Sequence, residues 1–109
     1  MAATPEKRVK DKVVAVLKQE GAYYFFPATH GYGRSGVPDI VACVSGLFLA
    51  VECKAGKNKI TDLQAREIQS IRAADGVAVV VNEENWDMLP ELIRKMKRGT
   101  SIIASVGDE

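Results

Sequence analysis

The sequence predicts an α/β fold: a mixed sheet of about four strands with helices packed on its faces. Stretches with helical and strand-like spacing of apolar residues follow one another in the order α-β-β-β-α-β-α. Two of the strand-like stretches, residues 39–44 and 47–53, are apolar on both faces, which is typical of strands in the middle of a layered sheet. The length suits one core, so we expect a single domain over residues 1–109.

The first helix is predicted over residues 5–20, with Thr4 as its N-cap, Pro5 in its first turn and Gly21 at its end. Glu6 continues the inward stripe of this helix toward the N-terminus. An acid in the first turn also complements the helix dipole, so a functional and a structural role for Glu6 both stay open. The buried stripe itself comprises Val9, Val13, Val16 and Leu17.

Residues 23–27 predict a short aromatic strand, whose rings we expect to pack the sheet against the helices rather than to stack on bases. Residues 28–36 contain three glycines and form a loop that leads into the next strand. Loops in such positions often carry substrate contacts. Arg34 is the best candidate for a phosphate contact, because its guanidinium fork matches phosphate oxygens, and Ser35 lies beside it.

A Ser-Gly dipeptide at residues 45–46 separates the two apolar stretches and predicts a β-hairpin with a tight turn. A two-residue turn places Val44 opposite Leu47. Counting outward along the strands, it also places Asp39 opposite Glu52. A three-residue turn would shift the pairing by one residue and lose this register.

Asp39, Glu52 and Lys54 fall on one face of the predicted hairpin, because side chains alternate along a strand. Two carboxylates in opposed positions repel each other and destabilise a sheet unless a cation lies between them. Mg²⁺ accepts one or two protein carboxylates, and the lysine adds positive charge on the same face. The alternative is an ordinary hairpin with charged ends in water.

Pro38-Asp39, a spacer of twelve residues and Glu52-Cys53-Lys54 resemble the PD-(D/E)xK nuclease signature. Together with the Arg-Ser-Gly-Val stretch at residues 34–37 and the short length, the pattern is similar to one branch of that superfamily, the VRR-NUC domain, here as a standalone protein. The similarity extends from about residue 6 to residue 81. It implies a restriction-endonuclease-like core.

The resemblance implies metal-dependent hydrolysis of phosphodiester bonds. Asp39, Glu52 and the backbone carbonyl of Cys53 would hold one or two Mg²⁺ or Mn²⁺ ions, with Glu6 as a further ligand sent from the first helix. Lys54 would orient or deprotonate the attacking water, or stabilise charge on the phosphate.

A second helix is predicted over residues 61–74, after a basic loop that contains the candidate DNA contacts Lys57 and Lys59. Thr61 and Gln64 form a capping box, which is a complete structural reason for both residues. The resemblance offers another interpretation, since VRR-NUC relatives place a glutamine of this helix near the catalytic lysine. Both interpretations stay open.

The remainder of the chain predicts one strand and one helix. Residues 77–81 are all apolar and indicate an interior strand. A helix is expected over residues 90–98, ended by Gly99, and residues 101–106 fit either a short edge strand or a loose tail. The buried side of this helix comprises Leu89, Leu92, Ile93 and Met96.

Bulk properties narrow the expected partners. Fifteen basic against fourteen acidic residues give a net charge of +1, so binding by phosphate neutralisation alone should be modest. Cys43 and Cys53 fall on opposite faces of the hairpin and are expected to be reduced thiols in a cytoplasmic protein. No apolar stretch approaches the ~20 residues of a membrane span.

The predicted function is therefore a metal-dependent, structure-selective DNA endonuclease. Standalone VRR-NUC proteins are associated with four-way-junction cleavage as homodimers, so the resemblance implies a homodimeric Holliday junction resolvase. Candidate interface material is the aromatic strand and the apolar tail, residues 102, 103 and 106. The alternatives are a non-catalytic nucleic-acid-binding module with a nuclease-like fold and a nucleotide-binding domain. The sequence argues against a nucleotide-binding domain, because no glycine-rich phosphate loop follows a predicted strand.

Overall fold

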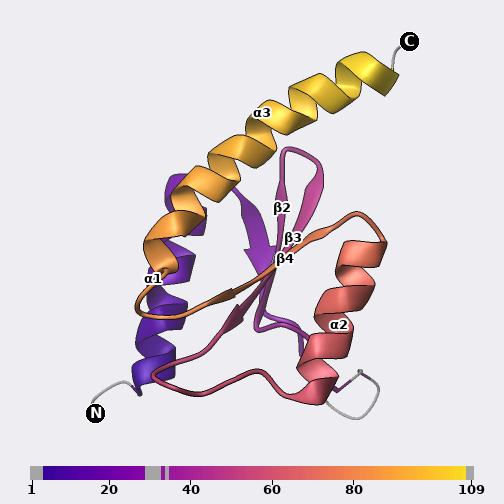
Figure 1. The fold of residues 1–109 in the computed structure, drawn as a ribbon. Helices are drawn as coiled ribbons and strands as arrows, with labels where there is room; N and C mark the ends of the chain where they lie inside the picture. Colours follow the sequence, from indigo (N-terminus) through magenta and orange to yellow (C-terminus); the bar gives the residue numbers. More distant parts are fainter. Residues whose placement is uncertain (1–3, 29–32, 34, 108–109) are drawn as a thin grey trace.

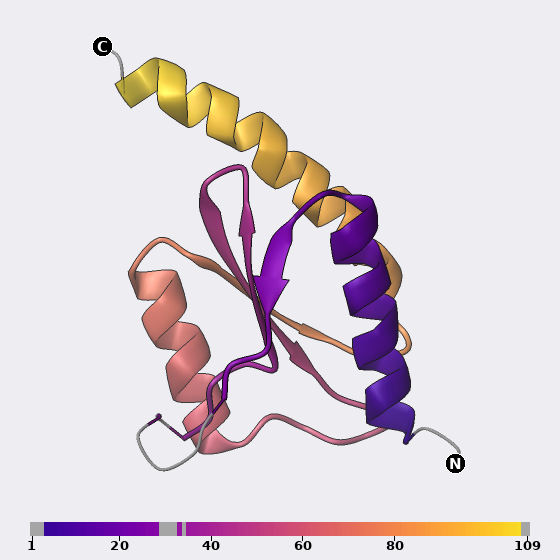
Figure 2. The same ribbon diagram turned by 180° about the vertical axis from the view of Figure 1, so that it is seen from behind.

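The computed structural model describes residues 4–28, 33 and 35–107, and for residues 100–107 it describes the backbone alone. One mixed four-stranded sheet, in the order β1-β2-β3-β4, separates two layers of helices. Helices α1 and α3 cover one face and α2 covers part of the other (Figures 1 and 2). The elements are α1 (Pro5–Gln19), β1 (Tyr23–Phe25), β2 (Ile40–Val44), β3 (Leu47–Cys53), α2 (Asp62–Ala73), β4 (Val77–Val81), the 3₁₀ turn η1 (Trp86–Met88) and α3 (Leu89–Gly107). The predicted fold class and element order are confirmed.

The hairpin has the predicted register. Strands β2 and β3 are antiparallel, with Val44 opposite Leu47 and Ile40 opposite Val51. Ser45 and Gly46 both have positive φ, as a two-residue type I′ turn requires. Strand β1 adds to β2 in the antiparallel sense, and β4 adds to β3 in the parallel sense after the α2 crossover.

The main core lies between the sheet and helices α1 and α3, and a smaller one lies under α2. The predicted stripes of α1 and α3 are buried in the main core, except that Leu92 is only partly buried. In the smaller core, Ile68 of α2 packs against Ala50 and Ala78 of the sheet. Apolar side chains removed from water on both faces supply most of the stability of such a layered fold.

Strand β4 was predicted to be interior, and this is wrong: it pairs only with β3 and forms an edge of the four-stranded sheet. Its apolar composition has a different cause. Ala78 is buried under α2, while Val81 is buried in the main core with Leu89 of α3. Helices therefore cover both faces of β4, although no strand of the described residues pairs with one of its edges.

The aromatic segment is also more exposed than predicted. Only Tyr24 packs against the main core, whereas Tyr23, Phe25 and Phe26 are 70%, 47% and 52% exposed. The reason is that β1 lies at the sheet edge farthest from β4, and α2 lies over the β3–β4 side.

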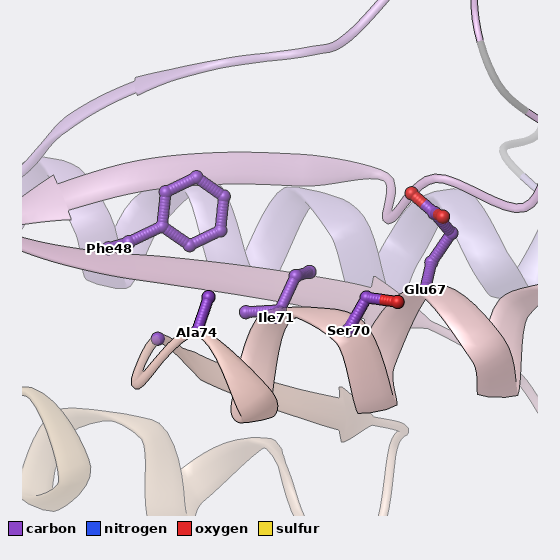
Figure 3. Close-up of a pocket in the computed structure, with 6 residues that line it drawn as sticks. Phe48, Glu67, Ser70, Ile71 and Ala74 are labelled. Carbon is purple, nitrogen blue, oxygen red and sulfur yellow. The ribbon is translucent and has the colours of Figure 1, made fainter.

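Phe48 of β3 lies at the boundary between the covered and the open part of this face. Its side chain is 44% exposed and lines a pocket of about 350 Å³ with Ile71 and Ala74 of α2. Figure 3 shows the ring beside the C-terminal end of that helix. On the other side the same ring borders Tyr23 and Phe25 of β1. An apolar patch therefore runs from α2 across the hairpin to the β1 edge.

Helix α3 continues past the predicted end at Gly99 and includes residues 101–106, so the expected edge strand or tail is wrong. A glycine in a helix costs only about 1 kcal/mol relative to alanine, which a long helix tolerates. In the described part of the chain, no helix is both long and apolar enough to cross a membrane.

Candidate active site

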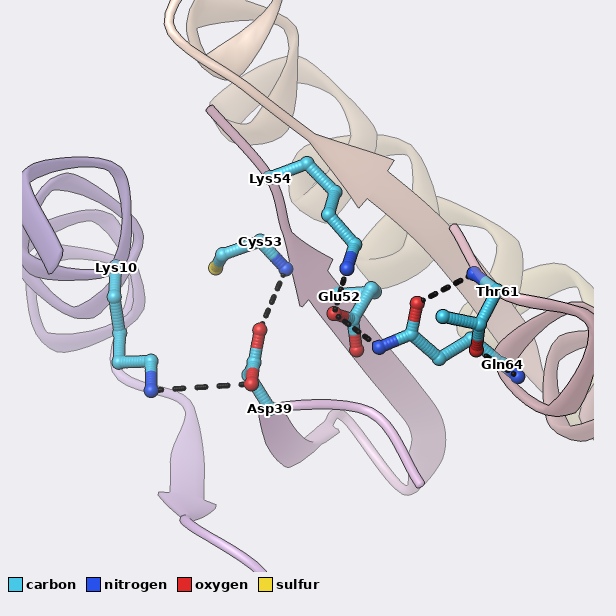
Figure 4. Close-up of polar contacts among 7 residues, drawn as sticks. All are labelled: Lys10, Asp39, Glu52, Cys53, Lys54, Thr61 and Gln64. Atoms are coloured by element: carbon cyan, nitrogen blue, oxygen red, sulfur yellow. Dashed lines mark hydrogen bonds and ion pairs between the residues drawn. The ribbon is translucent and has the colours of Figure 1, made fainter. Parts of the chain in front are cut away.

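The two carboxylates meet at the open end of the hairpin, as the register predicts. The β2–β3 pairing ends at Ile40 and Val51, and β3 continues beyond it. Asp39, the residue before β2, turns its carboxylate onto this extension, where the backbone N–H of Cys53 donates to Oδ2 at 2.9 Å (Figure 4). The hydrogen bond satisfies an amide that β2 no longer reaches, and it fixes Asp39 beside Glu52.

Glu52 is a buried carboxylate, with only 2% of the residue exposed. Its Oε2 accepts a hydrogen bond from Gln64 Nε2 at 3.2 Å and lies 3.7 Å from Lys54 Nζ. Its Oε1 is buried and has no hydrogen-bond partner among the described residues. Burial raises the pKa of Glu52 to about 7; the charge of Asp39 adds to the shift, and Lys54 opposes it.

Gln64 forms the predicted capping box and also contacts Glu52, while its implied approach to Lys54 stays a prediction. Its Oε1 accepts from the backbone N–H of Thr61 at 2.9 Å, and its own N–H donates to Thr61 Oγ1 at 3.2 Å, which completes the capping box. Its Nε2 points the other way, to Glu52 (Figure 4). The start of α2 is thus joined to the buried carboxylate through one side chain.

Lys10 is a site residue that sequence reasoning missed. Its ammonium lies 3.9 Å from Asp39 Oδ1 and 6.0 Å from the centroid of the Phe26 ring. The first helix contains several lysines, so the sequence did not distinguish Lys10 from the others. The usable signal was its position at the edge of the buried stripe of α1, seven residues before Leu17 and on the same side of the helix.

Glu6 lies at the rim of the site. It is exposed in the first turn of α1 and lines a pocket of about 380 Å³ with Ala55, Gly56 and Asn58. Its negative charge contributes weakly to the raised pKa of Glu52. Among the described residues, no group of three or more His, Cys, Asp or Glu side chains could hold a metal ion, so a ligand role for Glu6 stays a prediction.

The loop that enters β2 is held against α2. Gly36 has a φ of +81°, and a Cβ there would lie 2.6 Å from the backbone carbon of Leu63. A side chain is therefore excluded on two grounds. Of the predicted nucleic-acid contacts, Ser35 is exposed next to this glycine, whereas Arg34 lies outside the described residues.

Lys57 and Lys59 follow the site on the loop between β3 and α2. Both are exposed, as a phosphate contact requires. The loop is fixed to the segment that follows β4, because the Gly56 N–H donates to Glu83 Oε1 at 2.7 Å.

This arrangement of an acidic pair and a lysine at the end of a central hairpin, in a mixed four-stranded sheet flanked by helices, is that of the PD-(D/E)xK nuclease fold. The sequence model of the family described as "Archaeal holliday junction resolvase (hjc)" matches residues 6–107. The chain belongs to the archaeal Holliday junction resolvase (Hjc) family.

A solved structure titled "VRR_NUC domain" is similar to the chain, with a TM-score of 0.67 and 28% sequence identity over 82% of this chain and 97% of that one. The resemblance to a VRR-NUC domain is thereby confirmed. No match was found among curated proteins. The family and the fold are both those of nucleases.

Proposed function

We propose that this protein is a metal-dependent endonuclease that hydrolyses phosphodiester bonds in branched DNA and resolves four-way junctions. The observation that carries the proposal is Glu52 Oε1, a carboxylate oxygen that is buried without a hydrogen-bond partner among the described residues. Leaving such an atom unpaired is costly, and a cation bound beside Asp39 removes the cost.

The donor set fits a hard divalent ion. Asp39 and Glu52 supply carboxylate oxygens, the Cys53 carbonyl follows them on β3, and Glu6 lies at the rim. Mg²⁺ keeps several waters and needs only one or two carboxylates, so Asp39 and Glu52 suffice. When bound, Mg²⁺ or Mn²⁺ lowers the pKa of a water molecule and offsets negative charge on the phosphate.

The remaining polar side chains have distinct tasks in this proposal. Lys54 lies 3.7 Å from Glu52, so its ammonium is close enough to the acidic pair to hold the attacking water or stabilise the phosphate in the transition state. Gln64 donates a hydrogen bond to Oε2 of Glu52, so Oε1 is the oxygen that is left for the metal ion in this proposal.

The substrate is proposed from the family and from charge. A net charge of +1 gives little affinity for uniform duplex, so selection by DNA shape is favoured over selection by sequence. A four-way junction has a two-fold axis, and a homodimer with two equivalent sites matches it. The exposed apolar patch of Tyr23, Phe25 and Phe48 supports such a contact. The other expected interface residues, 102, 103 and 106, have side chains outside the described part of the chain.

A cleavage assay tests the proposal. Four-way junction, flap, splayed arm and linear duplex are incubated with Mg²⁺, Mn²⁺ or chelator, and light scattering gives the mass of the free protein. We expect paired, symmetric nicks in the junction by a dimer, and no cleavage in chelator.

Site variants complete that assay. Asp39→Asn and Lys54→Ala should each lose cleavage by more than about a hundredfold with the fold kept, whereas Lys18→Ala on the exposed side of α1 should cut normally. Cleavage in chelator would contradict the metal site. A monomer that cuts linear duplex as fast as junctions would contradict the proposed substrate.

A further inference from the structure

Each carboxylate of the site has its own lysine, and the two lysines come from different elements. Lys54, directly after β3, approaches Glu52, and Lys10 of α1 approaches Asp39 from the opposite side (Figure 4). The Cys53 N–H occupies Asp39 Oδ2, so Lys10 is directed to the other oxygen, Oδ1. Oδ1 is the Asp39 oxygen that the backbone leaves open to a metal ion.

The contact of Lys10 is poorly suited to a purely structural role. At 3.9 Å it is longer than a hydrogen bond, and the side chains of Lys10 and Asp39 are 35% and 26% exposed. Ion pairs of this kind contribute little to stability. Yet the lysine stands at the edge of the buried stripe of α1, on the same side of the helix as Leu17, where an apolar residue would widen the stripe.

We propose that Lys10 is a positioning residue that competes with the divalent ion for Asp39 Oδ1 and moves to a phosphate of the DNA when the ion binds. This inference rests on the proposed function. In the metal-free protein the ammonium neutralises Asp39. A metal ion bound at Oδ1 repels the ammonium, and the flexible stem of lysine allows it to turn toward the negatively charged backbone of the substrate.

Metal binding and DNA binding are therefore coupled through Lys10. Lys10 lowers the affinity of the free protein for metal, because the ion must displace it. Bound DNA offers the displaced ammonium a phosphate, so metal and DNA each strengthen the binding of the other, and linkage requires the effect to be reciprocal. The site would thus fill with metal mainly when a substrate is present.

The first test measures Mn²⁺ binding to the DNA-free protein by electron paramagnetic resonance. Lys10→Met keeps the length of the stem beside Phe26 and removes the charge, so its affinity for Mn²⁺ should rise about tenfold. Lys10→Arg should behave like the wild type, since it keeps the charge. Lys18→Met, which removes the same charge from the far end of the same helix, should leave the affinity unchanged.

The second test measures binding to an uncut junction in Mn²⁺ by fluorescence anisotropy, with Lys54→Ala present in every protein to suppress cleavage. Adding Lys10→Met should weaken junction binding about tenfold, because a phosphate contact is lost. Adding Lys18→Met should weaken it far less. The gain in Mn²⁺ affinity caused by DNA should shrink only in the Lys10→Met protein.

The outcomes separate the two proposals. Thermal melting first establishes that the variants are folded, and Lys10→Gln replaces Lys10→Met if the latter is not. A wild type that binds Mn²⁺ and cuts junctions, together with a folded Lys10→Met or Lys10→Gln variant whose Mn²⁺ affinity equals or falls below that of the wild type, would overturn this inference alone. A wild type that neither binds Mn²⁺ nor cuts would overturn the proposed function and this inference with it.

Discussion

The two faces of the β2–β3 hairpin are made by the same strands and differ in almost everything else. The face toward α1 and α3 is closed: Leu47 beside the turn is partly buried, and the other residues of this face are at most 2% exposed, namely Ile40, Ala42, Val44, Leu49, Val51 and Cys53. The face toward α2 is buried only around Ala50 and Glu52, while Cys43 and Phe48 are exposed.

This difference arises because side chains alternate between the two faces of the hairpin. One face packs the core, and the other carries the candidate site. The closed face contributes packing, and nothing on it is available to a ligand. The other face buries a carboxylate at the open end of the hairpin and exposes apolar side chains near the turn. Substitutions on the closed face should therefore change folding, whereas substitutions around Glu52 should change activity.

The largest expected effect is on activity. Glu52→Gln should reduce junction cleavage by more than about a hundredfold, because the metal site loses a charged ligand. The melting temperature of the metal-free protein should stay the same or rise, since a neutral amide is less costly to bury than a carboxylate. A large fall in melting temperature would show that the buried acid stabilises the fold and would remove the contrast between the faces.

The second effect is a pH dependence of stability in chelator. The pKa of Glu52 is raised to about 7 from an ordinary value of 4.5, so the folded protein holds a proton that the unfolded chain releases earlier. The stability from this proton is present below about pH 4.5 and is lost as the pH rises through 7. Between pH 5 and 7.5 the free energy of unfolding should fall by roughly 2 kcal/mol relative to Glu52→Gln, measured by urea unfolding. If the free energies of unfolding of the wild type and Glu52→Gln changed equally with pH, the prediction would be contradicted.

The third comparison uses one residue type on both faces. Val51→Ala on the closed face should lower the free energy of unfolding by roughly 1–3 kcal/mol, because it leaves a cavity. Val41→Ala, on the half-buried face, should cost less than about 1 kcal/mol. Cleavage by the folded fraction should be unchanged for Val51→Ala. Equal losses of stability would mean that the two faces are packed alike.

The fourth comparison separates the two roles of Gln64. Thr61→Ala and Gln64→Ala both break the capping box, so each should cost about 1 kcal/mol in unfolding experiments. Only Gln64 contacts Glu52, and its removal should also slow cleavage about tenfold. Cleavage that falls equally in both variants would assign the loss to the helix terminus.

The smallest effect concerns the thiols. Cys43 is exposed and Cys53 is buried, and burial, followed by the charge of Asp39, raises the pKa of Cys53 to about 12. A thiol reagent should therefore modify one cysteine per native chain, identified as Cys43 by mass spectrometry. Modification of Cys53 at a similar rate would show that the closed face opens readily.

The hairpin and its acidic pair were predictable because a two-residue turn leaves only one register. Once Val44 faces Leu47, the positions of Asp39 and Glu52 follow from counting. Gln64 was predicted only as two alternatives, a capping box or a place near the catalytic lysine, because the sequence does not show where each end of its amide points. Tertiary structure determines which partner each end of the amide contacts, and the local sequence pattern does not report it.

The errors of prediction have a common physical cause. Apolar composition reports whether faces are covered, and it does not report which edge of the sheet a strand occupies. Strand β4 is apolar because helices cover both of its faces, and the rings of Tyr23 and Phe25 are exposed because no helix covers theirs. Lys10 was missed since the value of a lysine depends on a partner that lies 29 positions away in the chain.

The site depends on β4, a strand that is synthesised after the residues of the site itself. Every side chain described in the site belongs to the first 64 residues, but the backbone N–H of Lys54 donates to the carbonyl of Val81 at 2.9 Å. A nascent chain that ends before β4 contains the acids and the lysine, yet the edge of β3 that carries them has no neighbour on that side. The candidate site residues are therefore synthesised before the strand that holds β3 in place, and a product truncated before β4 is expected to carry these residues without the proposed nuclease activity.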